Sequence, residues 1–378
     1  MFDKMGKKKY LVPLGALCGF LLLMSLLMYP MLHSNPVNVP YAILSLDQGI
    51  ETPAGQVNAG QALVDKVSGA QAAQDGEDPD GSSDSPIAWT VFTSQEDFDS
   101  AMEDSQFYGG AVIPADFTQK QLDAQAQPSV QIITDSAKNA SLSQSLQSSL
   151  TSTLKDAGIA VETSAVHDVD PGNSTAASMI GQLSVAPLLA MSMTGGLIMF
   201  LVTRAKKGAS RAERAKTFAI QLGYAAGLSL CAALADVFIA GVVGGLNLPL
   251  AAFLSHQWLC SFCIMTFLLG IMNIAFGLGT VGMMVCMGTM SCACIAPEML
   301  PQAWLDWVYP WSPARFVVEG ARQVVFLGAG ALNSSSLYML VFAVIGLGCG
   351  LVGVLLAGGG HTEGEGVRSA AVNAPAAA

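Results

Sequence analysis

The sequence predicts an α-helical polytopic membrane protein that carries a small inserted α/β domain, and three observations predict it. Of 378 residues, 52% are hydrophobic and 12% are charged, with a mean hydropathy of +0.49, whereas soluble proteins average about 25% charged residues. Long apolar segments recur along the chain. The charges are segregated, because residues 35–183 hold 20 acidic and 4 basic residues. This composition excludes a single soluble domain and a disordered chain, and the net charge of −11 argues against a nucleic-acid partner.

Six segments reach or approach the ~20 apolar residues that cross a bilayer: Tyr10–Leu32, Leu183–Thr203, Thr217–Gly244, Trp258–Leu278, Val281–Pro297 and Leu337–Ala357. The first has a basic start, but its long apolar run and the lack of an A-x-A-like site favour an uncleaved anchor over a signal peptide. Only Gly279 and Thr280 separate the fourth segment from the fifth. We expect a tight hairpin there rather than one broken helix, because the glycines favour a break and the stretch is too long for one crossing.

Lysine and arginine near the segment ends predict the orientation, since cytoplasmic loops carry an excess of both. Four lysines precede the first segment, and six cations follow the second: Arg204, Lys206, Lys207, Arg211, Arg214 and Lys216. Both regions are therefore expected inside. The chain then divides into a cytoplasmic N-terminus with helix 1 (residues 1–34), an extracellular acidic domain (35–182), helices 2–6 (183–357) with a basic cytoplasmic loop (204–216), and a cytoplasmic tail (358–378).

The sequence of the acidic domain, residues 35–182, predicts alternating strands and helices. Branched and aromatic runs predict strands at Val39–Leu46, Ile87–Phe92, Gly110–Ile113 and Val130–Thr134. A serine cap at Ser94 and the proline at Pro114 favour helix starts, and leucines at 142, 146, 150 and 154 mark one buried helix face. The acidic stretches Asp75–Asp84 and His167–Asp170 are expected to be surface loops. Together these signals predict a small α/β domain.

Motifs for catalysis are absent. The chain has no G-x-x-x-x-G-K-[ST], no H-E-x-x-H and no G-x-S-x-G, and its four histidines are scattered. We expect no enzyme, no catalytic residue and no cofactor bound by this chain. All eight cysteines lie outside residues 35–183, which excludes a disulfide-stapled outer domain. Cys260-x-x-Cys263 and Cys292-x-Cys294 are more simply packing residues than a metal site.

One acid, Asp236, lies inside the third apolar segment, where a charge costs at least ~2.5–3.5 kcal/mol. Two interpretations have equal weight. Either Asp236 lines or gates a pathway, or it is a protonated, hydrogen-bonded or near-interface carboxylate with a structural role.

The outer stretch 298–336 concentrates aromatic and charged residues. Trp304, Trp307, Tyr309 and Trp311 suit the membrane interface. The spacing of Arg315, Glu319 and Arg322 allows them to pair on one helix face. We expect an interfacial or re-entrant amphipathic helix here, with a plain loop anchored by aromatics as the alternative.

Several motifs resemble those of one transporter group. Ser45–Gly49 resembles an N-x-D-x-G turn with serine in place of asparagine, Asn58–Leu63 an N-x-G-x-x-L helix start, and Tyr108–Phe117 a Y-x-x-x-x-I-P-x-x-F motif. Further matches lie at Leu300-Pro301, Tyr309–Pro313 and Glu319–Arg322. In their order and topology they resemble the ABC-2 type permeases, and specifically the phage infection protein (YhgE/Pip) family.

The resemblance implies an ABC-2 exporter fold and the membrane subunit of an ATP-driven exporter in a bacterial plasma membrane. It implies a homodimer or a heterodimer with a related permease, and a separate ABC ATPase that hydrolyses the ATP. The basic loop 204–216 is where such permeases place the coupling helix, although its cations also suit anionic lipid headgroups. The alternative function is a non-transporting surface protein whose outer domain binds a partner, an envelope polymer or a phage.

Overall fold

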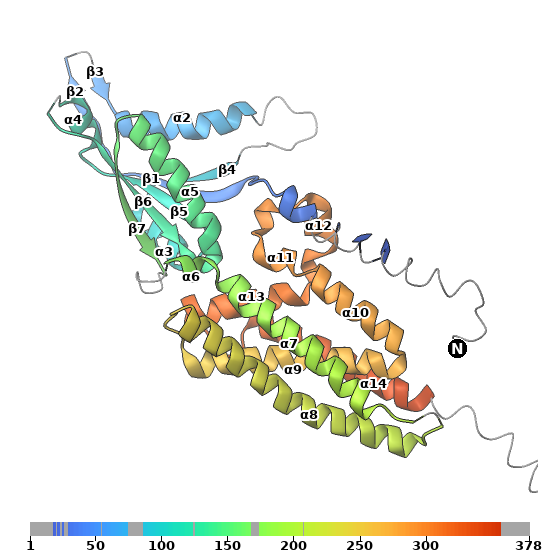
Figure 1. Ribbon diagram of the computed structural model, residues 1–378. Helices are drawn as coiled ribbons and strands as arrows, with labels where there is room; N and C mark the ends of the chain where they lie inside the picture. Colours follow the sequence, from blue (N-terminus) through green and yellow to red (C-terminus); the bar gives the residue numbers. More distant parts are fainter. Residues whose placement is uncertain are drawn as a thin grey trace, which may run out of the picture.

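A computed structural model describes residues 29–53, 55–74, 86–123, 125–167, 174–206 and 208–356, together with Cys18, Gly19, Leu21, Leu22 and Ser25. Five predicted features lie wholly or mostly outside this part of the chain: the first membrane segment, the acidic stretches 75–84 and 167–170, Lys207 and the tail 358–378. Figure 1 shows two parts, a β-sheet with its own helices and a bundle of long helices, with the sheet at one end of the bundle.

The sheet has five strands in the order β4-β1-β5-β6-β7. They are β1 (Val39–Ser45), β4 (Ile87–Phe92), β5 (Gly109–Ile113), β6 (Ser129–Asp135) and β7 (Ala160–Val166). β1 runs parallel to β4 and β5, β5 is antiparallel to β6, and β6 is parallel to β7. All four predicted strands are confirmed. The edge strand β7 and the small hairpin of β2 (Ile50–Thr52) and β3 (Gly55–Val57) escaped the prediction because they are short or polar.

Helices cover both faces of the sheet. They are α2 (Ala59–Gln74), α3 (Gln95–Glu103), α4 (Phe117–Leu122), α5 (Ser136–Asp156) and the short α6 (Ser174–Ser178). Because side chains alternate along a strand, Tyr41 and Ile43 face α2 and α5, whereas Leu44 faces Phe98 of α3. The predicted Ser94 cap is confirmed by its bond from the Asp97 N–H, at 3.5 Å.

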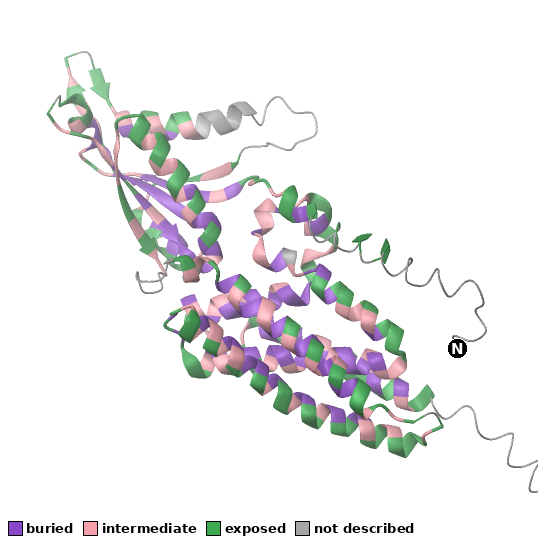
Figure 2. Cartoon of the chain, in the orientation of Figure 1, coloured by how far each residue is buried: buried purple, intermediate pink, exposed green. Residues whose placement is uncertain are grey.

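Five helical segments in the described residues are long and apolar enough to cross a membrane. They are α7 (Ile180–Thr203), α8 (Arg211–Val237) continued by a π-helix (Phe238–Val243), α9 (Leu250–Ile274), α10 (Phe276–Gly288) with α11 (Ser291–Cys294), and α14 (Ser334–Leu356). Figure 2 shows buried residues along the bundle interior and exposed ones on its outer faces. Those outer faces carry many apolar side chains, Val202, Val344 and Leu351 among them, as lipid contact requires.

The predicted hairpin at Gly279 and Thr280 is wrong in position. α9 ends at Ile274, and the extended Ala275 (φ −153°, ψ 128°) makes the turn. Gly277 and Gly279 both lie inside α10. Gly279 serves close packing rather than a break, because a Cβ there would lie 2.1 Å from Cγ of Met272.

Glycines also bring α9 and α14 into close contact. A Cβ at Gly270 would lie 1.9 Å from the carbonyl oxygen of Gly346, and a Cβ at Gly346 would lie 2.5 Å from Cα of Phe267. Farther along α14, Gly353 lies equally close to the backbone of Asn273. Small residues allow membrane helices to approach in this way.

Residues 298–336 are largely helical, as predicted. This stretch contains two 3₁₀ turns (Pro297–Met299 and Tyr309–Trp311), the short helix α12 (Gln302–Trp307) and the amphipathic helix α13 (Pro313–Phe326). Figure 1 shows α13 between the sheet and the long helices. One face of α13 is buried in the bundle core through Phe316, Val317 and Val318, and Ala321 packs against Ala137 of α5.

Candidate functional site

Among the described residues of the bundle, one carboxylate is fully buried: Asp236, near the C-terminal end of α8. Nε2 of Gln257 on α9 donates to Oδ2 of Asp236 at 2.6 Å and lies 3.4 Å from the carbonyl oxygen of Ser184 on α7. All three residues are fully buried. Oδ1 of Asp236 and Oε1 of Gln257 have no hydrogen-bond partner among the described residues. The contact therefore joins three helices through a group that is costly to bury.

Further polar contacts follow the same three helices toward their other end. Ser192 of α7 and Ser261 of α9 lie 2.7 Å apart. Nearer that other end, Nε2 of Gln221 on α8 donates to Oγ1 of Thr203 at 3.0 Å. Nδ2 of Asn273 on α9 donates to Oε1 of Gln221 at 2.7 Å. We call this set the polar ladder: Ser184, Asp236, Gln257, Ser192, Ser261, Thr203, Gln221 and Asn273.

Of the polar ladder, only Asp236 was predicted from the sequence. The missed signal was the presence of uncharged amides and hydroxyls in apolar helices, where each needs a partner. Asp236 lies in the bundle interior, a placement that both interpretations allow, and it is hydrogen-bonded to a neighbouring helix. The π-helix that begins two residues after it is a feature often found at functional sites.

Cations occupy the opposite end of the bundle. Arg204 and Lys206 lie in the connection after α7, and Arg211, Arg214 and Lys216 lie in the first turns of α8. The predicted loop 204–216 is therefore corrected: it is a short connection followed by the start of a membrane helix. Hydropathy did not detect this start because it registers only the apolar part of α8. The start is fixed by a capping box, in which Ser210 and Glu213 satisfy each other's backbone N–H groups.

These five cations form no ion pair within 4.0 Å in the described part of the chain. Figure 1 shows the connection from α7 to α8 at the end of the bundle farthest from the sheet. Cations that lack an ion-pair partner among the described residues can bind an acidic protein surface or anionic headgroups.

The aromatic residues of segment 298–336 differ in exposure, and two of its charged residues form an ion pair. Trp307 is 78% exposed and Trp311 is 45% exposed, whereas Trp304 is buried against Cys292 and Leu300. Nε of Arg315 lies 2.5 Å from Oε1 of Glu319, and its guanidinium lies 3.9 Å from the Tyr309 ring centre. The predicted pairing of these two residues is confirmed.

Arg322 corrects the predicted charge cluster. Its Nη1 donates to the carbonyl oxygen of Lys138 in α5, at 3.0 Å, and forms no ion pair with Glu319 within 4.0 Å. It thereby ties α13 to the sheet. A second tie is made by Glu298, which accepts from the hydroxyl of Tyr108 through its carboxylate and from the Val37 N–H through its carbonyl, the latter at 3.0 Å.

The charged residues at this junction are half-buried. Burial and the nearby Glu298 carboxylate raise the pKa of the Tyr108 hydroxyl, so it remains a donor. Burial lowers the pKa of Lys138, although Glu298 and Asp135 oppose the shift. Nζ of Lys138 donates to the Gln106 carbonyl at 2.6 Å. The junction is therefore a set of specific bonds rather than a loose contact.

The cysteine pairs lie in packed clusters rather than in a ligand set. Cys260 and Cys263 belong to the bundle core. His256 approaches Cys260 at 3.6 Å, but its two nitrogens face backbone carbonyls of Val317 and Ala331. No group of three or more His, Cys, Asp or Glu side chains in the described residues has a geometry that could hold a metal ion.

A family model described as an ABC-2 family transporter protein matches residues 14–352. The chain belongs to the ABC-2 transporter family. No curated protein and no solved structure matches it. The five candidate membrane helices and this membership make the chain a multi-pass membrane protein. Membership in the ABC-2 family also implies a separate ABC ATPase as its partner.

Proposed function

We propose that this chain is the membrane-spanning permease subunit of an ATP-driven ABC-2 exporter, of the YhgE/Pip type, in a bacterial plasma membrane. The partner ATPase hydrolyses the ATP, and this chain binds no cofactor. Two permease chains, identical or related, make up the membrane part. The single observation that carries the proposal is a cluster of cations, without ion-pair partners in the described residues, at one end of a membrane bundle whose other end bears an acidic sheet domain.

The position of the cations supports one orientation of the chain in the membrane. Cations near membrane ends favour the cytoplasmic side, so the connection after α7 is inside and residues 35–182 are outside. The N-terminus and the tail 358–378 are inside in the same arrangement. The ATPase then docks on Arg204, Lys206, Lys207, Arg211, Arg214 and Lys216. The polar ladder positions α7, α8 and α9 relative to one another, and Asp236 is the residue whose contacts change when the bundle moves.

Docking is tested by neutralising the basic end. Arg204, Lys206, Arg211, Arg214 and Lys216 are changed together to Gln, and the chain is co-purified with its co-expressed ATPase. We expect loss of co-purification and of any permease-dependent change in ATP hydrolysis, because surface cations supply the docking charge. In the matched control, Lys120→Gln with Lys155→Gln on the sheet domain, both readouts persist. Unchanged binding and hydrolysis in the first variant would refute the docking site.

Orientation is tested by cysteine labelling in intact cells. Ser145→Cys places a thiol on an exposed position of α5, and Ala212→Cys places one at the exposed start of α8. A membrane-impermeant maleimide is expected to label the first above the unmodified chain and the second only after lysis. The reverse pattern overturns the orientation. A chain that never co-purifies with an ATPase, but binds partners through its sheet domain, would favour the surface-protein alternative.

A further inference from the structure

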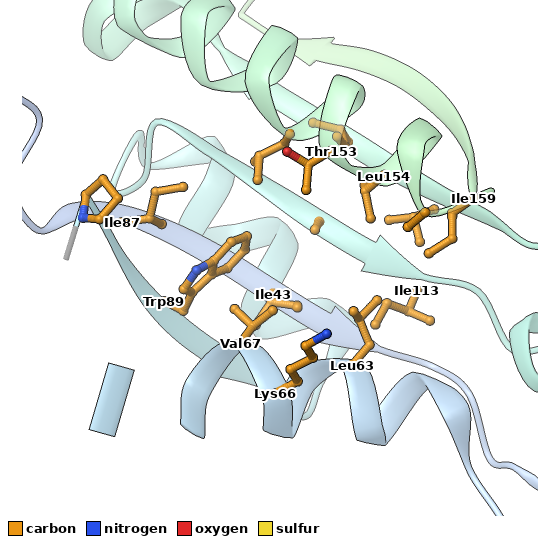
Figure 3. Close-up of a pocket in the computed structure, with 16 residues that line it drawn as sticks. Ile43, Leu63, Lys66, Val67, Ile87, Trp89, Ile113, Thr153, Leu154 and Ile159 are labelled. Atoms are coloured by element: carbon orange, nitrogen blue, oxygen red, sulfur yellow. The ribbon is translucent and has the colours of Figure 1, made fainter. Parts of the chain in front are cut away.

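A cavity of about 470 Å³ lies in the sheet domain, away from the polar ladder and the cations. Its floor is the sheet face that carries Ile43 and Ile113, and its sides are α2 and α5 (Figure 3). Trp89 lies at one end, and Ile159 lies toward the other. The cavity is open to solvent between the two helices, and its size falls within the range of small-molecule sites.

The wall of this cavity is almost entirely aliphatic or aromatic. Besides Trp89, only Lys66 and Thr153 among the lining residues have polar side-chain atoms, and the Thr153 hydroxyl already donates to the Ser149 carbonyl at 3.0 Å. An open apolar space of this kind is costly when only water fills it. It therefore favours an apolar chain as its occupant over a sugar, a nucleotide or a charged peptide.

Lys66, the one cation among the residues that line the cavity, indicates the charge of the ligand, because basic residues are rare in this domain. Residues 35–183 contain four basic residues against 20 acidic ones. Of the four lysines, Lys120 pairs with Asp116, Lys138 is held at the junction, and Lys155 lies outside the cavity. Lys66 is exposed, lines the cavity and forms no ion pair within 4.0 Å in the described residues. Figure 3 shows its side chain on α2 beside Leu63.

We propose that this cavity binds a single-chain anionic amphiphile, with its acyl chain against the sheet and its carboxylate or phosphate head beside Lys66. Charge complementarity favours an anionic head, because an ammonium of the substrate would lie next to the lysine ammonium. This site goes beyond the proposed permease function. It requires neither the ATPase nor a particular orientation of the chain.

The site is tested by photolabelling the full chain in phosphatidylcholine vesicles. The probe is a 16-carbon fatty acid that carries a diazirine on its chain, and the labelled peptides are identified by mass spectrometry. We expect labels on residues 63–67 of α2 and 150–159 of α5. Labels on the lipid-facing side of α14 report the probe in the bilayer and serve as an internal reference.

Two tryptophan variants distinguish labelling inside the cavity from labelling of the general surface. Thr153→Trp fills the cavity from an exposed helix position, and Ser152→Trp adds the same bulk at the adjacent exposed position, which does not line it. We expect Thr153→Trp to reduce labelling of α2 and α5 about tenfold or more relative to α14, since each displaced methylene is worth about fourfold in affinity. Ser152→Trp should leave the ratio unchanged. Equal labelling in both variants, or no label on α2 and α5 in the unmodified chain, overturns the site.

Competitors of equal chain length test the head group. The unlabelled fatty acid and the corresponding lysophosphatidate are compared with an alkyl trimethylammonium, and the better of the two anions distinguishes a free acid from a lipid source. Lys66→Glu should abolish the advantage of the anions, whereas Lys155→Glu, at an exposed site outside the cavity, should retain it. Equal competition by the cationic amphiphile overturns the anionic assignment. None of these readouts depends on ATP hydrolysis, so their failure is distinguishable from failure of the permease proposal.

Discussion

The close contact of α9 and α14 allows a direct test of the bundle through one methyl group. In Gly346→Ala the new Cβ would lie 2.5 Å from Cα of Phe267 and 2.5 Å from the carbonyl oxygen of Thr266. Both are backbone atoms, so no side chain can rotate away. Restoring an ordinary contact of about 3.4 Å requires the two helices to separate by roughly 0.9 Å.

The energetic cost follows from that separation. Overpacking of this kind typically costs about 1–3 kcal/mol, and a gap of 0.5–1 Å forfeits about a quarter to a half of the dispersion energy along the interface. Alanine also gains up to about 1 kcal/mol over glycine in helix propensity. Gly348→Ala is the matched control, because it makes the same change two residues away in α14, where nothing lies within 4 Å. The propensity gain cancels between the two variants.

The assay is reversible unfolding in mixed micelles, with the tryptophan fluorescence followed as SDS is added. We expect Gly346→Ala to be less stable than Gly348→Ala by about 1–3 kcal/mol, and Gly348→Ala to be at least as stable as the unmodified chain. Equal stability of the two variants would show that α9 and α14 are not in backbone contact, and the reasoning would fail.

Two further predictions concern buried carboxylates. Asp236→Leu should lower the free energy of unfolding of the bundle by about 1–3 kcal/mol, because Gln257 loses its acceptor. Asp236→Asn retains an acceptor oxygen and should cost under about 1 kcal/mol. Equal losses for the two variants in the same SDS titration would contradict this prediction. Asp47 accepts from Thr118 and from the N–H groups of Gly49 and Gly60. Burial alone would raise the pKa of Asp47, but these donors lower it below its ordinary value. Its stabilising effect is therefore present near neutral pH and is lost as the pH falls through that lowered pKa.

The measurement for Asp47 compares Asp47→Asn with the unmodified chain by hydrogen exchange of β1 and α2. We expect a loss of about 1–3 kcal/mol near pH 7 that shrinks on acidification below pH ~4. The exposed Asp116→Asn serves as the control and should change stability by less than about 1 kcal/mol. A deficit in Asp47→Asn that is constant with pH would rule out the ionised carboxylate as the cause.

Much of the architecture could be predicted from the residues alone. Continuous apolar runs predicted α7 and α14 to within a few residues, and the branched run Ile87–Phe92 predicted β4 without error, because burial of such runs determines these elements. The turn at Ala275 could not be predicted, because alanine carries no breaking signal. Gly277 and Gly279 do carry one, but both lie inside α10, and Gly279 packs closely against Met272 of α9.

The candidate site was less accessible to sequence reasoning because it depends on partners far apart in the chain. The spacing of Glu319 and Arg322 allowed them to pair, yet Arg322 binds the carbonyl of Lys138, 184 residues away. Gln257 meets Asp236 only because α8 and α9 pack together in one register. Periodicity predicts which face of a helix is buried, but it does not predict which side chains meet there.

The contacts between the sheet domain and residues 298–322 bear on the order in which the chain folds. Val37, Tyr108 and Lys138 all bond to Glu298 or Arg322, which leave the ribosome well over a hundred residues after them. Domains fold as units during synthesis, with the N-terminal ones first. The sheet must therefore form before these contacts exist, and it can dock on the helices only after residues 298–322 have been synthesised and inserted.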